Sequence, residues 1–359
     1  MTMKRSKQQE KKPSKLSLAL KITLILAASL LICVTTYGMY LTKKVEHAAE
    51  QAYEPVEKRG ETSTKRPTEV KVEPVQDNVS VLFIGIDDSD QRGQGAEGSR
   101  SDALLLATLN RTTKTVKLLS IPRDSYVYVP HVGYKDKITH AHAFGGTLAT
   151  IETVEELFDI PVDYYVRMNF NAFIDVVDAL GGIEAEVPYA MLEKDEFDRN
   201  TVRLQPGLQH LNGREALALA RTRKLDSDME RGKRQQEILK AIAQQAASIS
   251  SITKYDELID AVGANMKTNM TFKEMKGFFS YLTQGVPRID SLTIEGYDDM
   301  STGIYYYQLE EQSLNETKEI LKSHLGLTEG DINTSNGSSL AGSGSEQTQS
   351  ESSTSSDQQ

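Results

Sequence analysis

Short apolar blocks alternate with polar stretches along most of the chain, and several blocks have the length and composition of β-strands. Residues 79–86, 103–109 and 115–121 come first, separated by a Gly-rich polar loop and by a turn-like segment at 110–114. Residues 164–168, 183–187 and 291–295 have the same character. We therefore expect a strand at each of these positions.

Between and after these blocks, apolar residues recur at spacings of three and four, which predicts helices. The helical segments are 143–158, 171–180, 214–220, 229–248, 255–266 and 272–282. Helices mixed with strands in this order indicate an α/β fold, with a central mixed sheet covered by helices in an α-β-α arrangement. No internal repeat interrupts the pattern, so residues 78–333 are interpreted as one domain.

A longer apolar run precedes the domain. Residues 22–42 carry no charge, and as a helix they would be about 31 Å long, enough to cross a bilayer. Seven Lys and Arg residues precede this run and two follow it directly, which places the N-terminus in the cytoplasm and the domain outside. A cleaved signal peptide is the alternative, but its apolar stretch would be shorter, and Tyr37 and Tyr40 fit an interfacial belt.

The remaining segments complete the predicted organisation. Residues 1–21 form a basic cytoplasmic segment, 22–42 a transmembrane helix, and 43–77 a charged extracytoplasmic linker with three prolines. Residues 334–359 include ten serines among 26 residues and almost nothing apolar, which predicts a disordered tail.

Charge and composition exclude several classes of protein. With one Cys in 359 residues, the chain has neither a disulfide scaffold nor a Cys-based zinc ribbon. The net charge is +8 for residues 1–44 and −18 for the rest of the chain. A nucleic-acid-binding role is therefore disfavoured for the larger, acidic part. His140 and His142 would share one face of a strand and suggest a metal, although packing is the commoner role for such residues.

Charged residues cluster where the first three strands begin and end. If these strands are antiparallel neighbours, Asp87, Arg100, Asp102 and Arg123 meet at one edge of the sheet. Two carboxylates beside two guanidiniums suit a hard divalent cation bound next to phosphate oxygens. The alternative interpretation is that these residues are solvated strand ends.

A second cluster lies around residues 221–236. Arg221 and Arg223 are two apart and share a face of an extended segment, where guanidinium groups suit phosphate oxygens. On the following helix, the apolar stripe of Ile238 and Ile242 extends back to Gln235 and Arg231, so Arg231 is expected to point inward. The alternative is an ordinary charged helix start, with Asp228 as N-cap or as an ion-pair partner of Arg231.

These residues resemble the LytR-CpsA-Psr proteins of Gram-positive cell envelopes. The resemblance covers the basic N-terminus, the apolar run and most of residues 79–282. Its motifs are VLFIGID (81–87), RSD (100–102), SIPRD (120–124), KI (137–138), FGG (144–146), DALGGI (178–183), LNGREAL (211–217), ARTR (220–223) and D-x-x-R-x-x-RQQ (228–236). Departures from the family pattern at Thr139, Leu219 and Met229-Glu230 remove none of the charged positions.

The resemblance implies an enzyme that transfers a glycopolymer, such as wall teichoic acid, from an undecaprenyl pyrophosphate carrier to peptidoglycan through a phosphodiester. Its partners would be this lipid-linked polymer, peptidoglycan and membrane lipid, and its cofactor Mg²⁺ or Mn²⁺. It also implies a long apolar pocket for the prenyl chain, whose residues the sequence does not identify. The implied roles are metal binding for Asp87 and Asp102, pyrophosphate binding for Arg100, Arg123, Lys137, Arg221, Arg223, Arg231 and Gln235, with Asp228 orienting an arginine.

Two other functions compete with this interpretation. A prenyl-pyrophosphate hydrolase would use the same cations with water as acceptor, and it would leave peptidoglycan unlabelled. A non-enzymatic envelope protein would bind wall polymer and would keep its function after loss of Asp87 or Arg221. No Walker loop, HExxH or GxSxG motif is present to support a P-loop NTPase, a zincin or a serine hydrolase.

Overall fold

The computed structural model describes residues 15–56, 59–60, 62–67, 71–74, 76–87, 98–195, 199–222, 228–248, 266–283 and 287–328. The predicted tail, residues 334–359, lies outside these ranges. So does the helix predicted at 255–266, except for Met266, which belongs to a strand.

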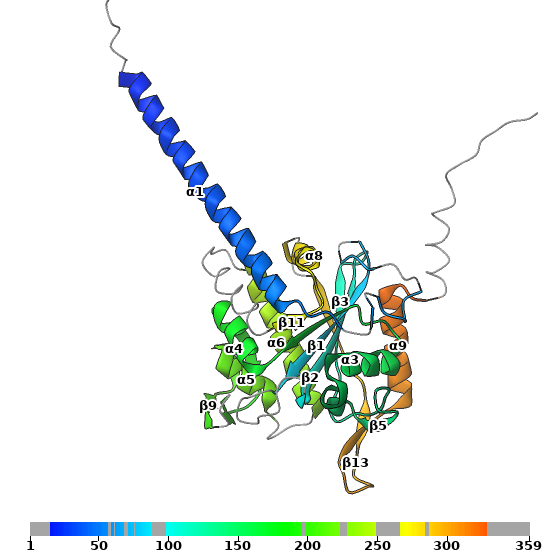
Figure 1. The fold of residues 1–359 in the computed structure, drawn as a ribbon. Coiled ribbons are helices and arrows are strands. Elements are labelled where there is room, and N and C mark those ends of the chain that lie inside the picture. The colour runs from blue at the N-terminus through cyan, green and yellow to red at the C-terminus, as the bar shows by residue number, and fades with distance from the viewer. Residues whose placement is uncertain are drawn as a thin grey trace, which may run out of the picture.

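A six-stranded mixed sheet forms the centre of the domain (Figure 1). Its order is β11-β6-β1-β2-β3-β12, and β1 to β3 are antiparallel neighbours, whereas β1–β6 and β3–β12 are parallel. The α/β fold and the antiparallel order of the first three strands are therefore confirmed. The strands are β1 (Val79–Ile86), β2 (Ser101–Asn110), β3 (Thr115–Ser120), β6 (Tyr164–Met168), β11 (Met266–Thr268) and β12 (Arg288–Leu292).

Helices cover both faces of this sheet because successive strand residues point to opposite sides. Leu82 and Ile84 of β1 belong to one apolar cluster, which includes residues of α3 (Ile138–Phe158) and α9 (Glu311–Leu325). Val81 belongs to a second cluster, which takes in α6 (Asp228–Ser248) and α8 (Phe272–Thr283). Beside α6 lie α4 (Phe170–Ala179) and α5 (Gly213–Arg221), on the side of the domain away from α3 (Figure 1).

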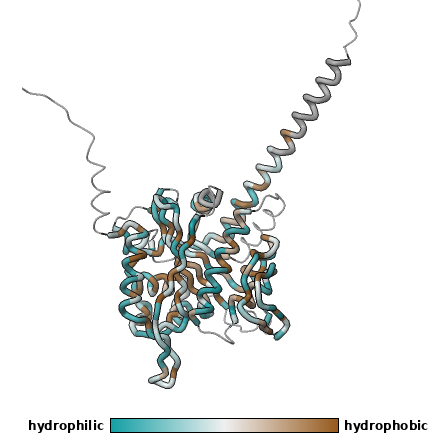
Figure 2. Tube along the Cα trace, turned by 180° about the vertical axis from the view of Figure 1, so that it is seen from behind, coloured by the Kyte–Doolittle hydropathy of each residue, from teal (hydrophilic) through white to brown (hydrophobic). Residues whose placement is uncertain are grey.

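Four two-stranded sheets surround the central one, and the sequence pattern predicts only β7 among their strands. They are β4 (Tyr126–Val129) with β5 (Tyr134–Lys137), β7 (Ile183–Val187) with β10 (Gly207–Leu211), β8 (Met191–Lys194) with β9 (Asn200–Leu204), and β13 (Gly296–Asp299) with β14 (Tyr306–Leu309). Figure 2 shows apolar residues concentrated in the interior of the domain and polar ones on its periphery.

Helix α3 begins five residues before the predicted start and breaks at Gly145 and Gly146, where the backbone is non-helical. His140 and His142 therefore lie on a helix, and the interpretation of these residues as strand neighbours that bind a metal is wrong. His140 Nδ1 lies 2.9 Å from Asp136 Oδ2, and His142 Nδ1 lies 2.8 Å from the carbonyl oxygen of Ser99. The two rings have separate structural partners.

Residues 22–42 lie within α1 (Lys15–Ala52), which extends away from the domain (Figure 1). Among the described residues, no helix combines the length and apolar character needed to cross a membrane. At the end of α1, Ala48, Ala49 and Ala52 are buried. Directly after it, the backbone N–H of Glu54 donates to the carbonyl of Thr268 in β11 at 2.7 Å.

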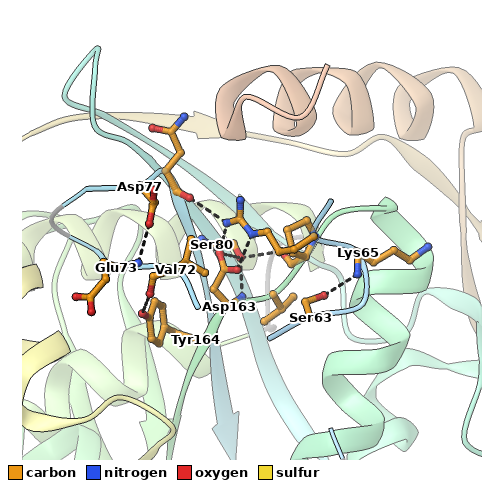
Figure 3. Close-up of polar contacts among 12 residues, drawn as sticks. Ser63, Lys65, Val72, Glu73, Asp77, Ser80, Asp163 and Tyr164 are labelled. Carbon is orange, nitrogen blue, oxygen red and sulfur yellow. Dashed lines mark hydrogen bonds and ion pairs between the residues drawn. The ribbon is translucent and has the colours of Figure 1, made fainter. Parts of the chain in front are cut away.

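Residues 59–60 and 62–67, which we call the fastening segment, connect the stretch after α1 to the edge of the domain, and Figure 3 shows part of these contacts. Arg59 and Ser63 both bond to the buried carboxylate of Glu155 in α3. Arg66 Nε donates to Asp163 Oδ1 at 2.9 Å, and Asp163 Oδ2 also accepts from the backbone N–H of Ser80 at 2.8 Å. Part of the segment interpreted as a linker is thus packed through buried ion pairs.

Candidate functional site

A cavity of about 770 Å³ lies between one face of the central sheet and helices α4, α5 and α6. Its wall from α6 includes Leu239 and four residues at spacings of three and four: Arg231, Gln235, Ile238 and Ile242. This is the stripe that the sequence pattern identifies, and it is expected of a helix that packs over a sheet. The inward orientation of Arg231 is confirmed, because its side chain is buried and lines the cavity.

The cavity changes from charged to apolar along its length. Asp87, directly after β1, is four residues from Phe83 on that strand, about 13 Å along an extended chain. On α6, Arg231 and Ile242 are eleven residues apart, about 16 Å along a helix. The apolar lining continues over neighbouring elements with Leu105, Val166, Met168, Phe173, Val176, Leu217, Leu239 and Met266.

The charged end follows from the register of the sheet. Ile86 at the end of β1 pairs with Ser101 at the start of β2, so Asp87 and Arg100 emerge together at the same edge. Asp102 follows on β2, and Arg123 comes shortly after β3 ends. All four of these residues line the cavity. Asp87 is only 5% exposed, whereas Arg100 is exposed.

Ion pairs hold the cations of this edge in place. Arg123 bonds to Asp102 and to Asp124, whose Oδ1 lies 2.9 Å from Lys137 Nζ. Burial works to lower the pKa of Arg123, but the attraction of Asp102 and Asp124 outweighs it and raises that pKa. Burial would raise the pKa of Asp124, but the hydrogen bond from Lys137 and the charge of Arg123 lower it. Arg123 and Asp124 therefore stay ionised.

Arg221, the last residue of α5, reaches the cavity across the ring of Phe170. Its guanidinium carbon lies 4.2 Å from the ring centroid, a cation–π contact that helps to fix the position of the guanidinium. Arg234 fixes the end of α5, because its side chain donates to the carbonyl of Leu219 at 3.2 Å and of Thr222 at 2.7 Å. These bonds satisfy carbonyl groups that a helix end leaves open.

Two side chains at the start of α6 complete this wall. Arg231 Nη1 lies 3.1 Å from Asp228 Oδ1, one helical turn earlier. Gln235 Nε2 donates to the carbonyl of Ala220 at 3.3 Å, which links α6 to the residue before Arg221. The ion pair expected from the spacing of Asp228 and Arg231 is thus present, and it orients an arginine that lines the cavity.

Comparison with known proteins identifies the family. A sequence model described as the LytR_cpsA_psr family matches residues 39–323. The chain belongs to this family. It is 43% identical over 329 residues to the polyisoprenyl-teichoic acid–peptidoglycan teichoic acid transferase TagT of Bacillus subtilis, covering 90% of this chain and 100% of that protein.

Solved structures agree with this assignment to the LytR_cpsA_psr family. One is described as TagT bound to LI-WTA, with a TM-score of 0.64 and 44% identity, and the match covers 75% of this chain and 98% of that one. Another is described as the LytR-CPS2A-psr family protein YwtF (TagT) with bound octaprenyl pyrophosphate lipid. It has a TM-score of 0.61 and 40% identity, with coverage of 75% and 98%.

Most residues singled out by the family resemblance lie around the one cavity. Asp87, Arg100, Asp102, Arg123, Arg221, Arg231 and Gln235 line it. Lys137 and Asp228 do not line it. Asp228 pairs directly with Arg231, and Lys137 is linked to Arg123 by two ion pairs that share Asp124. Arg223 lies outside the described residues, as does Asp88, a candidate general base by sequence position.

Three kinds of site residue were not predicted from the sequence. Phe170 supports Arg221, but it is the first residue of an ordinary helix, so its spacing gives no signal. Arg234 belongs to a recognised motif, yet only the structure shows that it holds α5. The apolar lining comes from separate strands and helices, although the α6 stripe could have indicated Ile238 and Ile242.

The residues of this site fit a magnesium ion that would also be bound by phosphate oxygens of a substrate. Asp87 and Asp102 are hard oxygen donors at the same end of the cavity, which suits Mg²⁺. Within the described ranges, no group of three or more His, Cys, Asp or Glu side chains is placed to hold a metal. An ion here would therefore take its remaining ligands from substrate oxygens and water.

Proposed function

We propose that this chain transfers a teichoic acid or similar anionic glycopolymer from a polyprenyl pyrophosphate carrier to peptidoglycan. The observation that carries the proposal is the cavity itself, in which one end gathers arginines and the other is apolar. A prenyl pyrophosphate has this same division between a doubly charged group and a long hydrocarbon chain. The names of related proteins support both substrates: TagT is named as a teichoic acid transferase acting on peptidoglycan, and one TagT structure holds octaprenyl pyrophosphate.

The residues divide the work of the reaction between them. Arg221, Arg231 and Arg123 lie where they can neutralise the pyrophosphate, and their fixed ion pairs and stacking reduce the cost of orienting them. A hydroxyl of the acceptor attacks the phosphorus that carries the polymer. The phosphoanhydride bond to the second phosphorus breaks, prenyl phosphate leaves, and the hydroxyl proton passes to a base. Such a transfer depends mainly on positioning and charge neutralisation.

The metal belongs to the proposal as well. Asp87 and Asp102 would hold Mg²⁺, or Mn²⁺ in its place, beside Arg100 at the charged end of the cavity. The ion would supply positive charge to the pyrophosphate oxygens. No enzyme-linked intermediate is needed, because the cations can stabilise a direct displacement.

The location of the enzyme is also proposed from the sequence. The uncharged run at 22–42 and the excess of Lys and Arg before it favour a single-pass anchor with the domain outside the cell membrane. Such an anchor would keep the cavity close to the bilayer from which a prenyl carrier comes.

An in vitro transfer assay tests the proposal. The full-length chain in detergent is mixed with a radiolabelled prenyl-pyrophosphate saccharide, Mg²⁺ and uncross-linked glycan strands. We expect metal-dependent label in the glycan, and its loss in Asp102→Ala and Arg221→Ala. Release of soluble saccharide without glycan labelling would indicate a hydrolase, and intact donor binding without turnover would indicate a carrier protein.

A further inference from the structure

Two hairpins near the charged end of the cavity share a surface rich in tyrosine. In the β4–β5 pair, Tyr126 lies opposite Lys137 and Tyr128 opposite Lys135, so these four side chains project from one face. The ring of Tyr306 in β14 lies 4.6 Å from that of Tyr126, between centroids. We call these five residues, together with Tyr297 on the same face of the β13–β14 hairpin, the tyrosine face.

Two rings of the tyrosine face are exposed, those of Tyr128 and Tyr297, and those of Tyr126 and Tyr306 are half-buried. Tyr128 is 44% exposed and Tyr297 is 63% exposed, whereas the alternate residues of β4, Val127 and Val129, are buried. A partly exposed surface with several aromatic rings is typical of a binding site. Tyrosine combines an apolar ring with a hydroxyl, so it suits a ligand that has both apolar faces and hydroxyl groups. Sugar rings have this character.

Polar contacts connect the tyrosine face directly to the proposed site. Lys137 Nζ lies 5.6 Å and 5.7 Å from the ring centroids of Tyr305 and Tyr306, and it also pairs with Asp124. Asp124 in turn bonds to Arg123, which lines the cavity. The backbone N–H of Tyr307 donates to the carbonyl of Asp124 at 2.9 Å, which fixes the β13–β14 hairpin beside this network.

Position and charge favour the acceptor over the donor as occupant. Figure 1 shows the β13–β14 hairpin at the end of the domain opposite α1, away from the side where the proposed anchor leaves. An acceptor glycan must bring its hydroxyl to the charged end of the cavity from outside, where the tyrosine face begins. Lys135 and Lys137 supply cations for the carboxylates that a peptide-substituted glycan carries.

We propose that the tyrosine face is the binding site for the saccharide chain of the acceptor, with rings of Tyr126, Tyr128, Tyr297 and Tyr306 against sugar rings. This inference rests on the proposed transfer to peptidoglycan and adds where the acceptor binds. It also gives Lys137 a second role, because the same ammonium group faces the tyrosine face and the Asp124 carboxylate.

The test measures acceptor and donor separately, with the full-length chain in detergent. Tyr128→Ala and Tyr297→Ala should each raise the acceptor KM, and the Kd for glycan strands measured calorimetrically without donor, by about tenfold. The KM for the prenyl-pyrophosphate donor should stay within about twofold, since the cavity is unchanged. Tyr128→Phe should keep most of the affinity because the ring remains.

Tyr53→Ala is the matched control, because Tyr53 is 43% exposed but lies beside β11, away from the two hairpins. It should leave both KM values unchanged. Unchanged acceptor KM and Kd in both alanine variants, or a raised donor KM alone, would overturn the inference while leaving the transferase proposal intact. If the wild-type chain fails to transfer but binds glycan strands through these tyrosines, the transferase proposal fails and the binding site stands.

Discussion

Arg221 has an aromatic partner, because its guanidinium carbon lies 4.2 Å from the ring centroid of Phe170, and its side chain lines the cavity. Lysine keeps the charge but loses both the stacking and the bidentate geometry. We therefore expect Arg221→Lys to lower kcat/KM for transfer by about 10- to 100-fold. Steady-state kinetics with the lipid-linked donor measure this. Arg288→Lys on the edge strand β12, an exposed arginine outside the cavity, is the control. Equal activities would contradict the assigned role.

His324 near the end of α9 gives a prediction about pH. Its ring is buried between Thr108 Oγ1 at 2.7 Å and Thr115 Oγ1 at 2.8 Å. Burial and the positive charge of Lys117 lower the pKa of this ring from 6.5 to about 4, although the negative charge of Asp290 acts in the opposite direction. Below pH 6.5 the unfolded chain binds a proton that the folded chain does not, so stability is full above 6.5 and falls as the pH approaches 4.

The loss of stability should total about 3 kcal/mol if the whole shift is expressed. Urea unfolding between pH 7 and pH 5 would show the start of this decrease. In His324→Gln, which cannot titrate, the decrease over this range should be smaller. The same slope in both proteins would mean that His324 does not set the pH dependence.

At the residue scale, the sequence identified most charges that line the cavity but not the contacts that position them. Asp87, Asp102 and Arg123 could be found because they flank predicted strands, and the register then brings them to one edge. The family resemblance predicts that Lys137 binds the pyrophosphate, yet in the structure its ammonium group pairs with Asp124 and does not line the cavity. Side-chain direction at a strand end depends on neighbours that are distant in sequence.

At the scale of elements, the fastening segment should contribute substantially to stability. The Asp163 side chain is 1% exposed and holds Arg66 through two oxygens. Arg66→Ala would remove the cation that pairs with this buried carboxylate and leave it with the bonds from Ser80. The free energy of unfolding should fall by about 3 kcal/mol. Thermal unfolding measures the change.

Lys65→Ala is the matched control for the fastening segment. Lys65 pairs with Asp159 at 2.7 Å, but the two side chains are 33% and 49% exposed. Its loss should cost less than about 1 kcal/mol. A similar cost for both variants would show that burial of the Arg66–Asp163 pair adds nothing.

Strong periodic elements could be predicted from sequence, and short hairpins could not. β1, β6 and β7 have the predicted bounds, because β1 and β6 are mostly buried apolar runs and β7 alternates buried apolar with exposed polar residues. β13 and β14 are rich in Asp, Tyr and Gln, so no apolar alternation marks them. Helix α3 begins early, and its first residues bond to neighbouring segments: the Ile138 N–H donates to the carbonyl of Ser125, and Thr139 Oγ1 donates to the carbonyl of Ser101 in β2.

At the scale of the whole molecule, the central sheet separates a supporting side from a functional side. Helices α3 and α9 pack on one face and carry the fastening contacts of Glu155 and the buried His324. Helices α4, α5 and α6 stand off the other face and leave the cavity between them and the sheet. Its charged end adjoins the tyrosine face, so a lipid-linked donor and a glycan acceptor would meet at Arg123 and Asp124.

The central claim is that one cavity holds the pyrophosphate at its charged end and the prenyl chain along its apolar walls. The most direct test is the affinity of the full-length chain for prenyl pyrophosphates of two, four and eight isoprene units. Wild-type affinity should rise with chain length as more apolar surface is buried. Arg221→Ala should weaken all three ligands by a similar factor.

Ile242→Asn should remove the gain of the longest ligand and leave the shortest unaffected, because Ile242 lies about 16 Å along α6 from Arg231. Ile320→Asn, at an exposed position on α9, should change none of the three affinities. Affinities that do not depend on prenyl length, or an equal loss for all lengths in Ile242→Asn, would contradict this account of the cavity.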